Sequence, residues 1–343
     1  MDRGAILLVR ADANARMGSG HIMRCLALAQ AWEEFGGRTM FLMAPGVPAL
    51  ESRLCSEGFE VELLHAEPGS LGDAAETGSL ARGQHPAWLA LDGYHFSAAY
   101  CDALRCEAKL LLFDDLGDAD CACADLILNQ NAYASREMYD GRPIDGRLLV
   151  GSRFTLLRRE FWAWRGRTRE VANEVSNVLV TLGGGDSENV TAKVLRALSQ
   201  LSGWTIRVMV GSSNPHSNEL QLLAASLPHR VDLRTETTRM ADEMAWADLA
   251  ISAGGSTTWE LAFMGVPAAL LVQAANQCGT ADYLHRHGIA INLGWHSQVS
   301  PEGIAQALWQ LGANTASRQS MSARGRALLD GFGGQRVVEA MTR

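Results

Sequence analysis

The chain has 343 residues, a length that fits two domains of ordinary size. Hydrophobic residues make up 47% and charged residues 20% of the chain, as in globular proteins that fold in water. The net charge of −8 argues against nucleic acid and, more mildly, against anionic membranes as partners, because both attract clustered Lys and Arg.

The first residues and the cysteines indicate the compartment. Residues 1–4 lead straight into a short apolar run, which does not resemble a secretory signal, and no apolar run reaches the roughly 18 residues of a membrane span. We therefore expect a cytoplasmic protein, in which the seven scattered cysteines stay reduced. Cys121 and Cys123 are separated by one residue, which is not a zinc-binding spacing, so we predict no metal site.

The chain is organised around residues 18–24, Gly-Ser-Gly-His-Ile-Met-Arg. The apolar run Ala5–Val9 before this stretch predicts a strand, and Cys25–Trp32 after it has the apolar spacing of a helix. Gly18 and Gly20 permit positive φ and close approach of a ligand. The start of a helix also offers unpaired N–H groups and partial positive charge, which suit an anion.

His21 lies at this predicted helix start, which favours the neutral imidazole, the form that can act as a general base near neutral pH. A plainer interpretation is open on spacing alone. The Gly-Ser-Gly segment can simply form a tight turn from strand to helix, with His21 as its cap.

The first half of the chain alternates strands with helical patterns such as Ala49–Glu57 and Ser97–Glu107. Short, continuously apolar strands that alternate with helices predict a parallel sheet covered on both faces. The predicted strands are Ala5–Val9, Thr39–Met43, Val61–Leu64, Trp88–Leu91, Lys109–Phe113, Leu126–Leu128 and Leu148–Val150.

Polar motifs follow three of these strands, at the carboxyl ends where parallel sheets bind ligands. They are residues 92–95 (Asp-Gly-Tyr-His), Asp114-Asp115 and residues 129–133 (Asn-Gln-Asn-Ala-Tyr). Each motif alone is more simply a turn or a helix cap. Together with Asp12 and His21 they point to one ligand site at the top of the sheet.

Residues 158–174 are rich in Arg, Glu and Trp and lack a strand pattern, so we place the interdomain linker there. The predicted domains are residues 1–160 and 172–315, followed by a helical tail, residues 316–343, that can cross back to the first domain. The tail has a break at residues 331–334. Strands are predicted in the second domain at Asn177–Leu182, Thr205–Val210, Val231–Leu233, Leu249–Ile251, Ala268–Leu271 and Ile289–Asn292.

Two glycine-rich loops mark the second domain. Residues 182–189 follow its first strand, and residues 251–260, Ile-Ser-Ala-Gly-Gly-Ser-Thr-Thr-Trp-Glu, follow its fourth strand and open a helix. Such loops admit a diphosphate, although neither one matches the P-loop or the G-x-G-x-x-G motif. Glu260 can accept hydrogen bonds from the two hydroxyls of a ribose. Alternatively, Ser256 or Thr257 is a plain N-cap and Glu260 closes a capping box.

These stretches taken together resemble the GT-B superfamily of two Rossmann-like domains whose parallel sheets face an interdomain cleft. Within it, the chain resembles the nucleotide-sugar hydrolases of pseudaminic acid biosynthesis, a pathway linked to flagellin glycosylation. The matching stretches are residues 10–12, 18–24, 92–94, 113–115, 129–133, 151–154, 183–186, 252–260 and 276–277. The loop at residues 183–186 departs from the family with a third Gly where Ser or Thr is frequent, and Ala11 replaces a frequent Ser.

The resemblance implies hydrolysis of a UDP-linked 2,4-diacetamido-2,4,6-trideoxy sugar, with inversion at C1 and without a cofactor or an obligatory metal. It implies that His21 is the catalytic base, that Tyr94 takes part in catalysis, and that Glu260 and Asn276 hold UDP. The full set of expected substrate-binding residues is Asp12, Gly18, Gly20, Arg24, Asp92, Asp115, Asn129, Asn131, Gly184, Gly254, Gly255, Ser256, Thr257, Glu260, Asn276 and Gln277.

Three other functions fit the same motifs. A GT-B glycosyltransferase would use His21 to activate an acceptor hydroxyl, although the sequence shows no clear apolar or basic patch in the first domain for a lipid acceptor. A sensor would bind a nucleotide sugar without turnover. A nucleotide-sugar epimerase is a weaker alternative, because its site usually carries more carboxylates and histidines.

Overall fold

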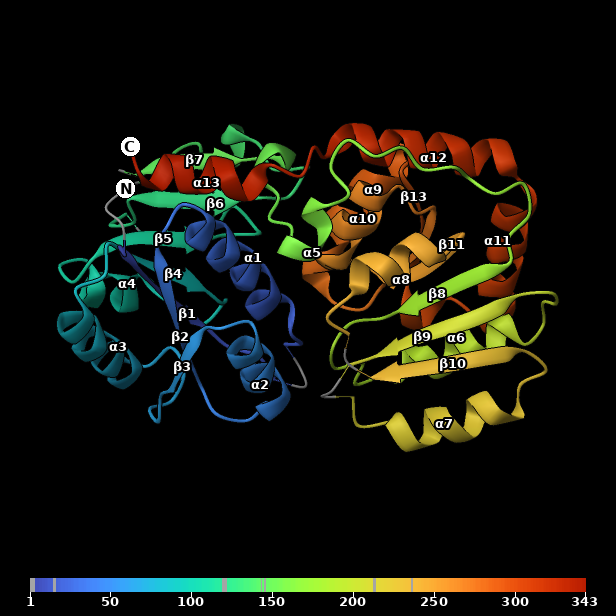
Figure 1. Ribbon diagram of the computed structural model, residues 1–343, viewed down its shortest axis with the longest axis horizontal. Helices are drawn as coiled ribbons and strands as arrows, with labels where there is room; N and C mark the ends of the chain where they lie inside the picture. Colours follow the sequence, from blue (N-terminus) through green and yellow to red (C-terminus); the bar gives the residue numbers. More distant parts are fainter. Residues whose placement is uncertain are drawn as a thin grey trace. The chain divides into compact units, whose positions relative to one another are not determined.

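The computed structural model describes residues 4–14, 17–118, 122–142, 144, 146–211, 214–235 and 237–343 (Figure 1). Cys121, which together with Cys123 forms the closely spaced cysteine pair, lies outside these residues. The chain forms two compact units. Unit 1 takes residues up to 14, 19–159 and 331–343, and unit 2 takes most of the remainder, residues 160–330.

Unit 1 is built on a seven-stranded, fully parallel sheet of strand order β3-β2-β1-β4-β5-β6-β7. Every strand lies within two residues of its predicted ends, and the central strands β1, β4, β5 and β6 are short apolar runs that are almost fully buried. The strands are β1 (Ile6–Ala11), β2 (Arg38–Met43), β3 (Glu60–Leu63), β4 (Trp88–Asp92), β5 (Lys109–Phe113), β6 (Leu126–Asn129) and β7 (Arg147–Val150).

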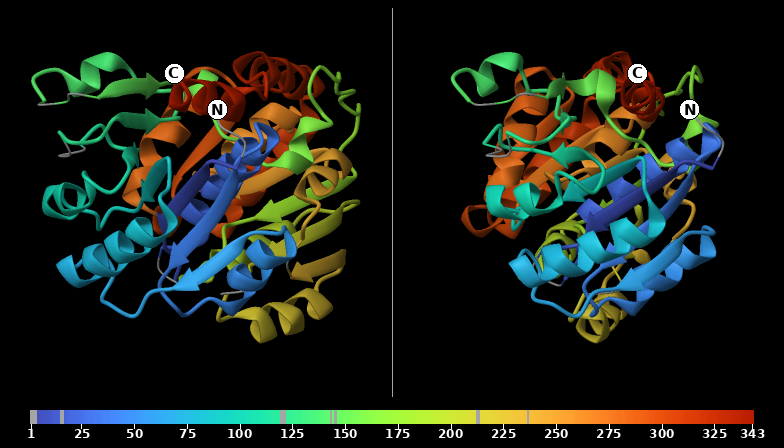
Figure 2. Two further views of the ribbon diagram at one scale, coloured as in Figure 1. Left: turned by 60° about the vertical axis from the view of Figure 1, so that its left-hand side comes forward. Right: turned by 90° about the vertical axis from the view of Figure 1, so that its left-hand side faces the viewer.

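The helices of unit 1 come from both ends of the chain. They are α1 (Gly20–Glu34), α2 (Pro48–Ser56), α3 (Leu71–Gln84), α4 (Ala98–Leu104), α13 (Gly333–Met341) and the 3₁₀ turns η1 (Arg136–Tyr139) and η2 (Ser152–Phe154). The C-terminal helix α13 packs on α1 and η2 (Figure 2), and the Trp88 indole N–H donates to the Met341 carbonyl oxygen at 2.9 Å.

The predicted break at residues 331–334 is wrong in detail. Helix α12 (Thr315–Leu328) ends earlier, and Gly333 and Gly334 open α13 instead of interrupting it. A Cβ atom on Gly333 would collide with the backbone of Phe154 and Thr155, so this glycine allows the helix start to approach the chain closely.

Unit 2 repeats the plan with a six-stranded parallel sheet of order β10-β9-β8-β11-β12-β13. Its strands are β8 (Asn177–Thr181), β9 (Thr205–Val210), β10 (Arg230–Thr235), β11 (Leu249–Ala253), β12 (Ala268–Val272) and β13 (Ala290–Trp295). Its helical segments, including the one at the junction of the two units, are α5 (Arg159–Trp162), α6 (Val190–Leu198), α7 (Ser217–Ser226), α8 (Met240–Trp246), α9 (Thr257–Met264), η3 (Ala275–Gln277), α10 (Cys278–Arg286), η4 (His296–Gln298), α11 (Pro301–Ala313) and α12.

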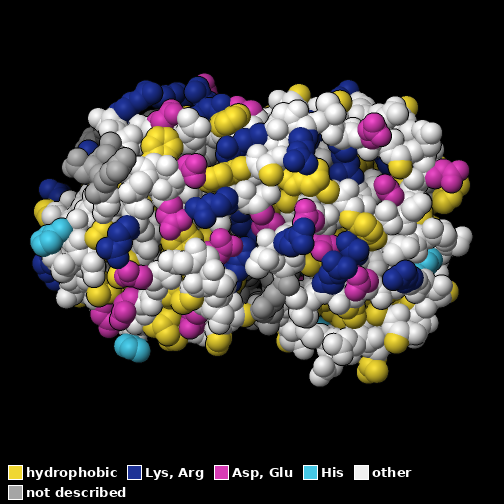
Figure 3. Space-filling model, viewed as in Figure 1, with side chains coloured by type: hydrophobic (Ala, Val, Ile, Leu, Met, Phe, Trp, Pro, Cys, Tyr) yellow, Lys and Arg dark blue, Asp and Glu magenta, His cyan; other side chains and the backbone are white. Residues whose placement is uncertain are grey.

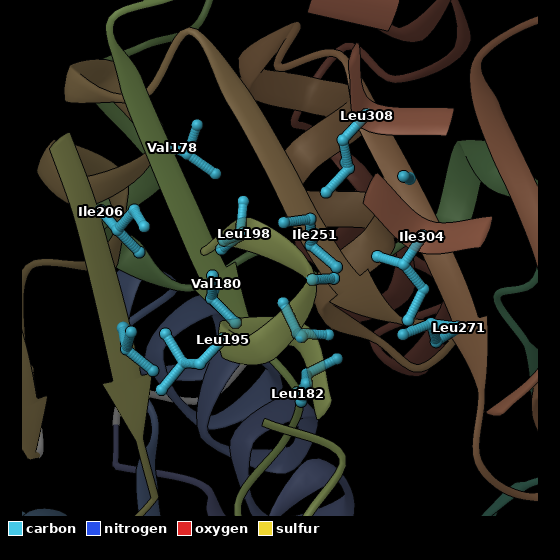
Figure 4. Close-up of a cluster of buried hydrophobic side chains, with 14 of the residues drawn as sticks. Val178, Val180, Leu182, Leu195, Leu198, Ile206, Ile251, Leu271, Ile304 and Leu308 are labelled. Carbon is cyan, nitrogen blue, oxygen red and sulfur yellow. The ribbon is translucent and has the colours of Figure 1, made fainter. Parts of the chain in front are cut away.

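One hydrophobic core joins the sheet of unit 2 to α6 and α11 (Figure 4). Val180 and Ile251 from the central strands meet Leu195 of α6 and Ile304 of α11, and all four side chains are fully buried. Burying a side chain of this size contributes roughly 1.5–3 kcal/mol. The core therefore fixes the central strands, and with them the loops at their carboxyl ends.

In each sheet the strand order reverses at the centre, between β1 and β4 in unit 1 and between β8 and β11 in unit 2. The crevice beside such a reversal, at the carboxyl ends of the strands, is where open α/β sheets bind ligands. The helix that carries His21, α1, is the next element after β1, and the second glycine-rich loop directly follows β11. Across the described ranges, no helix is long and apolar enough to cross a membrane.

A fully buried ion pair ties β1 to α3. The Arg10 guanidinium donates to both Asp73 carboxylate oxygens, at 3.0 and 2.9 Å, and neither side chain is exposed.

We predict that Asp73→Ala lowers the free energy of unfolding by about 3–5 kcal/mol, because it leaves the buried Arg10 charge with one carboxylate partner fewer. Denaturant unfolding measures this loss. In the Arg38–Glu60 pair, whose side chains are 67% and 57% exposed, Glu60→Ala should cost less than about 1 kcal/mol.

Candidate functional site

The loop before α1 positions His21. Gly18 has φ +76°, a conformation that favours glycine, and a Cβ there would meet open space. Gly20 was expected to take positive φ, like Gly18. Instead it is the first residue of α1 and does not have positive φ. His21 is therefore the second residue of the helix, and its side chain is only 7% exposed.

His21 is held by a carboxylate at the end of the neighbouring central strand. Its Nδ1 lies 2.5 Å from Oδ1 of Asp92, the last residue of β4, which is completely buried. An ionised carboxylate can only accept, so Nδ1 carries the hydrogen; in the neutral form of the ring the lone pair is then on Nε2. No described residue makes a hydrogen bond to Nε2. The tautomer is that of a general base oriented by an aspartate.

Arg24 lies one helical turn after His21 and joins two carboxylates. Its Nε and Nη2 donate to the two oxygens of Asp92, both at 2.6 Å, and its Nη1 donates to Asp115 at 2.7 and 2.8 Å. Burial alone would raise the pKa of Asp92 and Asp115, but the Arg24 charge holds the pKa of each below its ordinary value. Both carboxylates are therefore ionised at neutral pH beside the imidazole.

Three more of the predicted residues of unit 1, Tyr94, Asn129 and Asn131, gather around Asp115. The Tyr94 hydroxyl donates to Asp115 at 2.8 Å, and the Tyr94 ring meets the His21 ring edge-on with centroids 5.0 Å apart. The Asn131 side-chain amide donates to Asp115 at 2.9 Å and to the side-chain oxygen of Asn129 at 3.0 Å. One hydrogen-bonded network thus contains the polar residues that follow β4, β5 and β6.

Three members of this network were not among the predicted site residues. The Tyr133 hydroxyl donates to the Asp115 carbonyl at 2.9 Å, and Phe113 lies under the Arg24 guanidinium at 5.0 Å. The Cys25 thiol lies 3.4 Å from Asp92, and burial raises its pKa well above the usual value. Tyr133 ends the motif at residues 129–133 and Phe113 begins the stretch at residues 113–115, whereas nothing in the pattern of residues singled out Cys25.

The adjacent residues Asp114 and Asp115 have different roles. One oxygen of Asp114 accepts hydrogen bonds from the backbone N–H groups of Leu116 and Gly117, at 3.0 and 2.9 Å, which shapes the turn after β5. Only Asp115 faces Arg24. Asp12 also lies apart from the His21 network, because its carboxylate contacts Arg10, the Ala44 N–H and His95.

The second glycine-rich loop of unit 2 opens α9 as predicted. The backbone N–H groups of Gly255, Ser256 and Thr257 donate to no described residue, while the next two amides bond back to the loop. Ser256 makes no side-chain capping bond. The helix start therefore presents successive unpaired amides, an arrangement that suits a phosphate group.

Glu260 is the fourth residue of α9, so it cannot close a capping box, which needs the third helical residue. That position is occupied by Trp259. The alternative interpretation of Glu260 as part of a capping box is therefore wrong. Glu260 lies one turn inside the helix and is partly exposed.

Gln277, in the segment between β12 and α10, makes hydrogen bonds that hold the second glycine-rich loop. Its side-chain oxygen accepts hydrogen bonds from the N–H groups of Gln273, just after β12, and Gly254, at 2.9 and 3.3 Å. A Cβ on Gly254 would lie 3.0 Å from the Cβ of Gln277, so this position favours glycine. The partly exposed Asn276 lies in η3, directly before Gln277.

The first glycine-rich loop of unit 2 is less open to an anion. Its Asp186 accepts hydrogen bonds from the N–H groups of Val190 and Thr191, at 2.8 and 2.9 Å, and so caps the start of α6. Burial raises the pKa of Asp186. A carboxylate therefore already occupies the amides that a phosphate would use, and Gly184 lies in the loop just before it.

Neither half of the fold assembles a group of three or more His, Cys, Asp and Glu side chains suited to a metal ion, as far as the described ranges extend. All six described cysteines are free.

Comparison with known proteins finds distant relatives of the chain. Residues 177–330 match the glycosyltransferase family 28 C-terminal domain. The chain is 29% identical to the spore coat polysaccharide biosynthesis protein SpsG of Bacillus subtilis over 237 residues, which cover 68% of each chain. It is 26% identical to the UDP-2,4-diacetamido-2,4,6-trideoxy-beta-L-altropyranose hydrolase of Campylobacter jejuni over 290 residues, which cover 83% of this chain and 98% of the relative.

Solved structures agree on the fold. The spinosyn rhamnosyltransferase SpnG complexed with thymidine diphosphate superposes with a TM-score of 0.68 at 17% identity, covering 98% of this chain and 100% of SpnG. The predicted GT-B-like fold with two Rossmann-like units is confirmed. The chain is a distant homologue of the altropyranose hydrolase and of the family 28 C-terminal domain.

The two ionised carboxylates around Arg24 predict a pH dependence of stability. Because their pKa values are lower in the folded state than the ordinary 3.8, the unfolded chain binds more protons in acid. Their stabilisation is complete above about pH 5 and is lost as the pH falls through 4 and below. Asp92→Asn should lower the free energy of unfolding at pH 7 by about 3 kcal/mol and flatten its decline between pH 5 and pH 3. Denaturant unfolding at several pH values measures both, and an unchanged slope would contradict the assignment.

Proposed function

We propose that the protein hydrolyses a UDP-linked 2,4-diacetamido-2,4,6-trideoxy sugar, releasing UDP and the free sugar. The observation that carries this proposal is the His21–Asp92 pair, an arrangement that suits a general base because the second ring nitrogen has no hydrogen-bond partner among the described residues. Support for the substrate class comes from the Campylobacter hydrolase, which the alignment covers almost from end to end.

In the proposed reaction, Nε2 of His21 accepts a proton from a water molecule while the water oxygen forms a bond to C1 of the sugar. The C1–O bond breaks, and UDP leaves with the electron pair, so C1 is inverted. Asp92 stabilises the imidazolium that forms, through the 2.5 Å contact to Nδ1. A base in this position typically contributes about 10²–10⁴-fold in rate.

Unit 2 would bind the UDP moiety. The unpaired amides at the start of α9 suit the diphosphate, and they also stabilise the negative charge that develops on it as the C1–O bond breaks. Glu260 would accept hydrogen bonds from the ribose hydroxyls, and Asn276 would contact the nucleotide. Gln277 would act indirectly, since its side-chain oxygen holds Gly254.

A glycosyltransferase is the second candidate, and one observation favours it. Lys and Arg side chains gather along one rim of unit 1 (Figure 3), and the segment from η1 to η2 carries four exposed arginines: Arg136, Arg142, Arg147 and Arg153. Such a rim would suit an acidic acceptor.

Mixing the purified protein with a panel of UDP-sugars, without any acceptor, tests the choice. We expect UDP release from the diacetamido-trideoxy sugar nucleotide, and His21→Asn should lower kcat by about 10²–10⁴-fold because the base is lost. The matched control is His85→Asn, at an exposed helix end whose left-handed conformation Asn tolerates. Release that needs an acceptor would favour the transferase, and undiminished hydrolysis by the His21 variant would remove His21 from the mechanism.

Nucleotide binding by unit 2 is tested separately, without turnover. Glu260→Gln should weaken UDP binding about tenfold, because one charged hydrogen-bond acceptor is lost. Titration calorimetry with UDP measures the change, and the exposed Glu302→Gln in α11 is the control. Equal affinities of the Glu260 variant and the wild type would place the ribose elsewhere.

A further inference from the structure

The second polar cluster of unit 1 contains an unusual pair. Nε2 of His95 lies 3.0 Å from Oδ2 of Asp12 in an ion-pair contact, and neither of these buried atoms makes a well-aligned hydrogen bond with any described residue. The other oxygen of Asp12 accepts from the Arg10 guanidinium at 2.6 Å and from the Ala44 N–H at 2.7 Å. Asp12 thus connects the carboxyl ends of β1 and β2 to the loop that follows β4.

The surroundings of His95 are shaped to hold its ring. A Cβ on Gly93 would lie 2.6 Å from Cε1 of His95, and a Cβ on Gly69 would lie 2.5 Å from the His95 carbonyl oxygen. The Phe96 ring packs on the imidazole with centroids 4.1 Å apart. Only 21% of the His95 side chain is exposed. Two glycines and an aromatic ring therefore leave the imidazole little freedom to turn away from Asp12.

The loop that carries His95 also carries two partners of His21. Residues 92 and 94 face the His21 network, through the Asp92 contact to Nδ1 and the Tyr94 contacts to His21 and Asp115. Residue 95 faces Asp12 instead. Tyr94 is 52% exposed, so its place against His21 and Asp115 also depends on the backbone that it shares with residue 95. The anchor next to it in the chain is His95.

We propose that His95, paired with Asp12, is a positioning residue that fixes Tyr94 against His21 and Asp115. This inference rests on the proposed function, in which the imidazole of His21 must keep one orientation to take a proton from water. A residue that acts in this way lowers kcat more than it changes KM, since it contacts neither the nucleotide nor the sugar. Burial by itself would raise the pKa of Asp12, but the contacts with His95 and Arg10 hold it well below its ordinary value, so a carboxylate faces His95.

Two substitutions of similar size distinguish the effect of the His95 N–H donor from the effect of the packing of its side chain. His95→Gln keeps an N–H donor near the position of Nε2, and His95→Leu keeps the bulk without a donor. We expect His95→Leu to lower kcat about tenfold with KM within twofold of the wild type, and His95→Gln to retain at least half of the wild-type kcat. Gly93→Ala, which pushes on the ring from the other side, should resemble His95→Leu. Equal losses in the Gln and Leu variants would overturn the proposal.

A double-mutant cycle tests whether His95 acts through Tyr94. If it does, His95→Leu should lower kcat no further in a Tyr94→Phe background. Independent, multiplicative losses would contradict the proposal. Hydrogen exchange of peptides from residues 92–104 adds a readout that needs no turnover, and it should quicken in His95→Leu but not in His85→Asn. If no UDP-sugar is hydrolysed by the wild type, the proposed function fails, whereas unchanged exchange in His95→Leu would refute the anchoring role itself.

Discussion

The buried carboxylate of Asp92 is the interaction on which the rest of unit 1 depends. It accepts from the imidazole of His21 and from two nitrogens of Arg24, and none of its surface is exposed. A buried carboxylate is tolerated only when its lone pairs are filled and its charge is balanced. The strand β4 ends at this residue and α1 begins opposite it, so the switch between β1 and β4 places the charge where the helix can meet it.

The two units supply different chemistry at equivalent places in their sheets. Unit 1 offers ionisable side chains, His21 and Asp115 among them, that follow its strands. Unit 2 offers backbone amides at the start of α9, steadied by the side chain of Gln277. Side chains can exchange protons with a substrate, whereas amides hold an anion without exchanging protons. This division suits a reaction in which a nucleotide leaves as an anion.

The fold could be predicted from the sequence because its central strands are short apolar runs that the helices bury, as Val178–Val180 of β8 illustrates. The candidate site was predicted in part, because the polar residues that end parallel strands must meet. What the sequence could not show is how each carboxylate is used. Asp114 and Asp115 are adjacent, yet one shapes a turn and the other faces Arg24. The contact between Asp12 and His95 joins two loops that are 83 residues apart in the sequence, so no local sequence pattern could predict it.

Hydrolysis in water enriched with oxygen-18, followed by mass spectrometry of both products, tests the central proposal most directly. If His21 directs water to C1 of a UDP-linked sugar, the heavy oxygen will enter the free sugar and the released UDP will stay unlabelled. Label in the β-phosphate of UDP would mean that the phosphorus–oxygen bond breaks instead, and attack at C1 would then have to be abandoned.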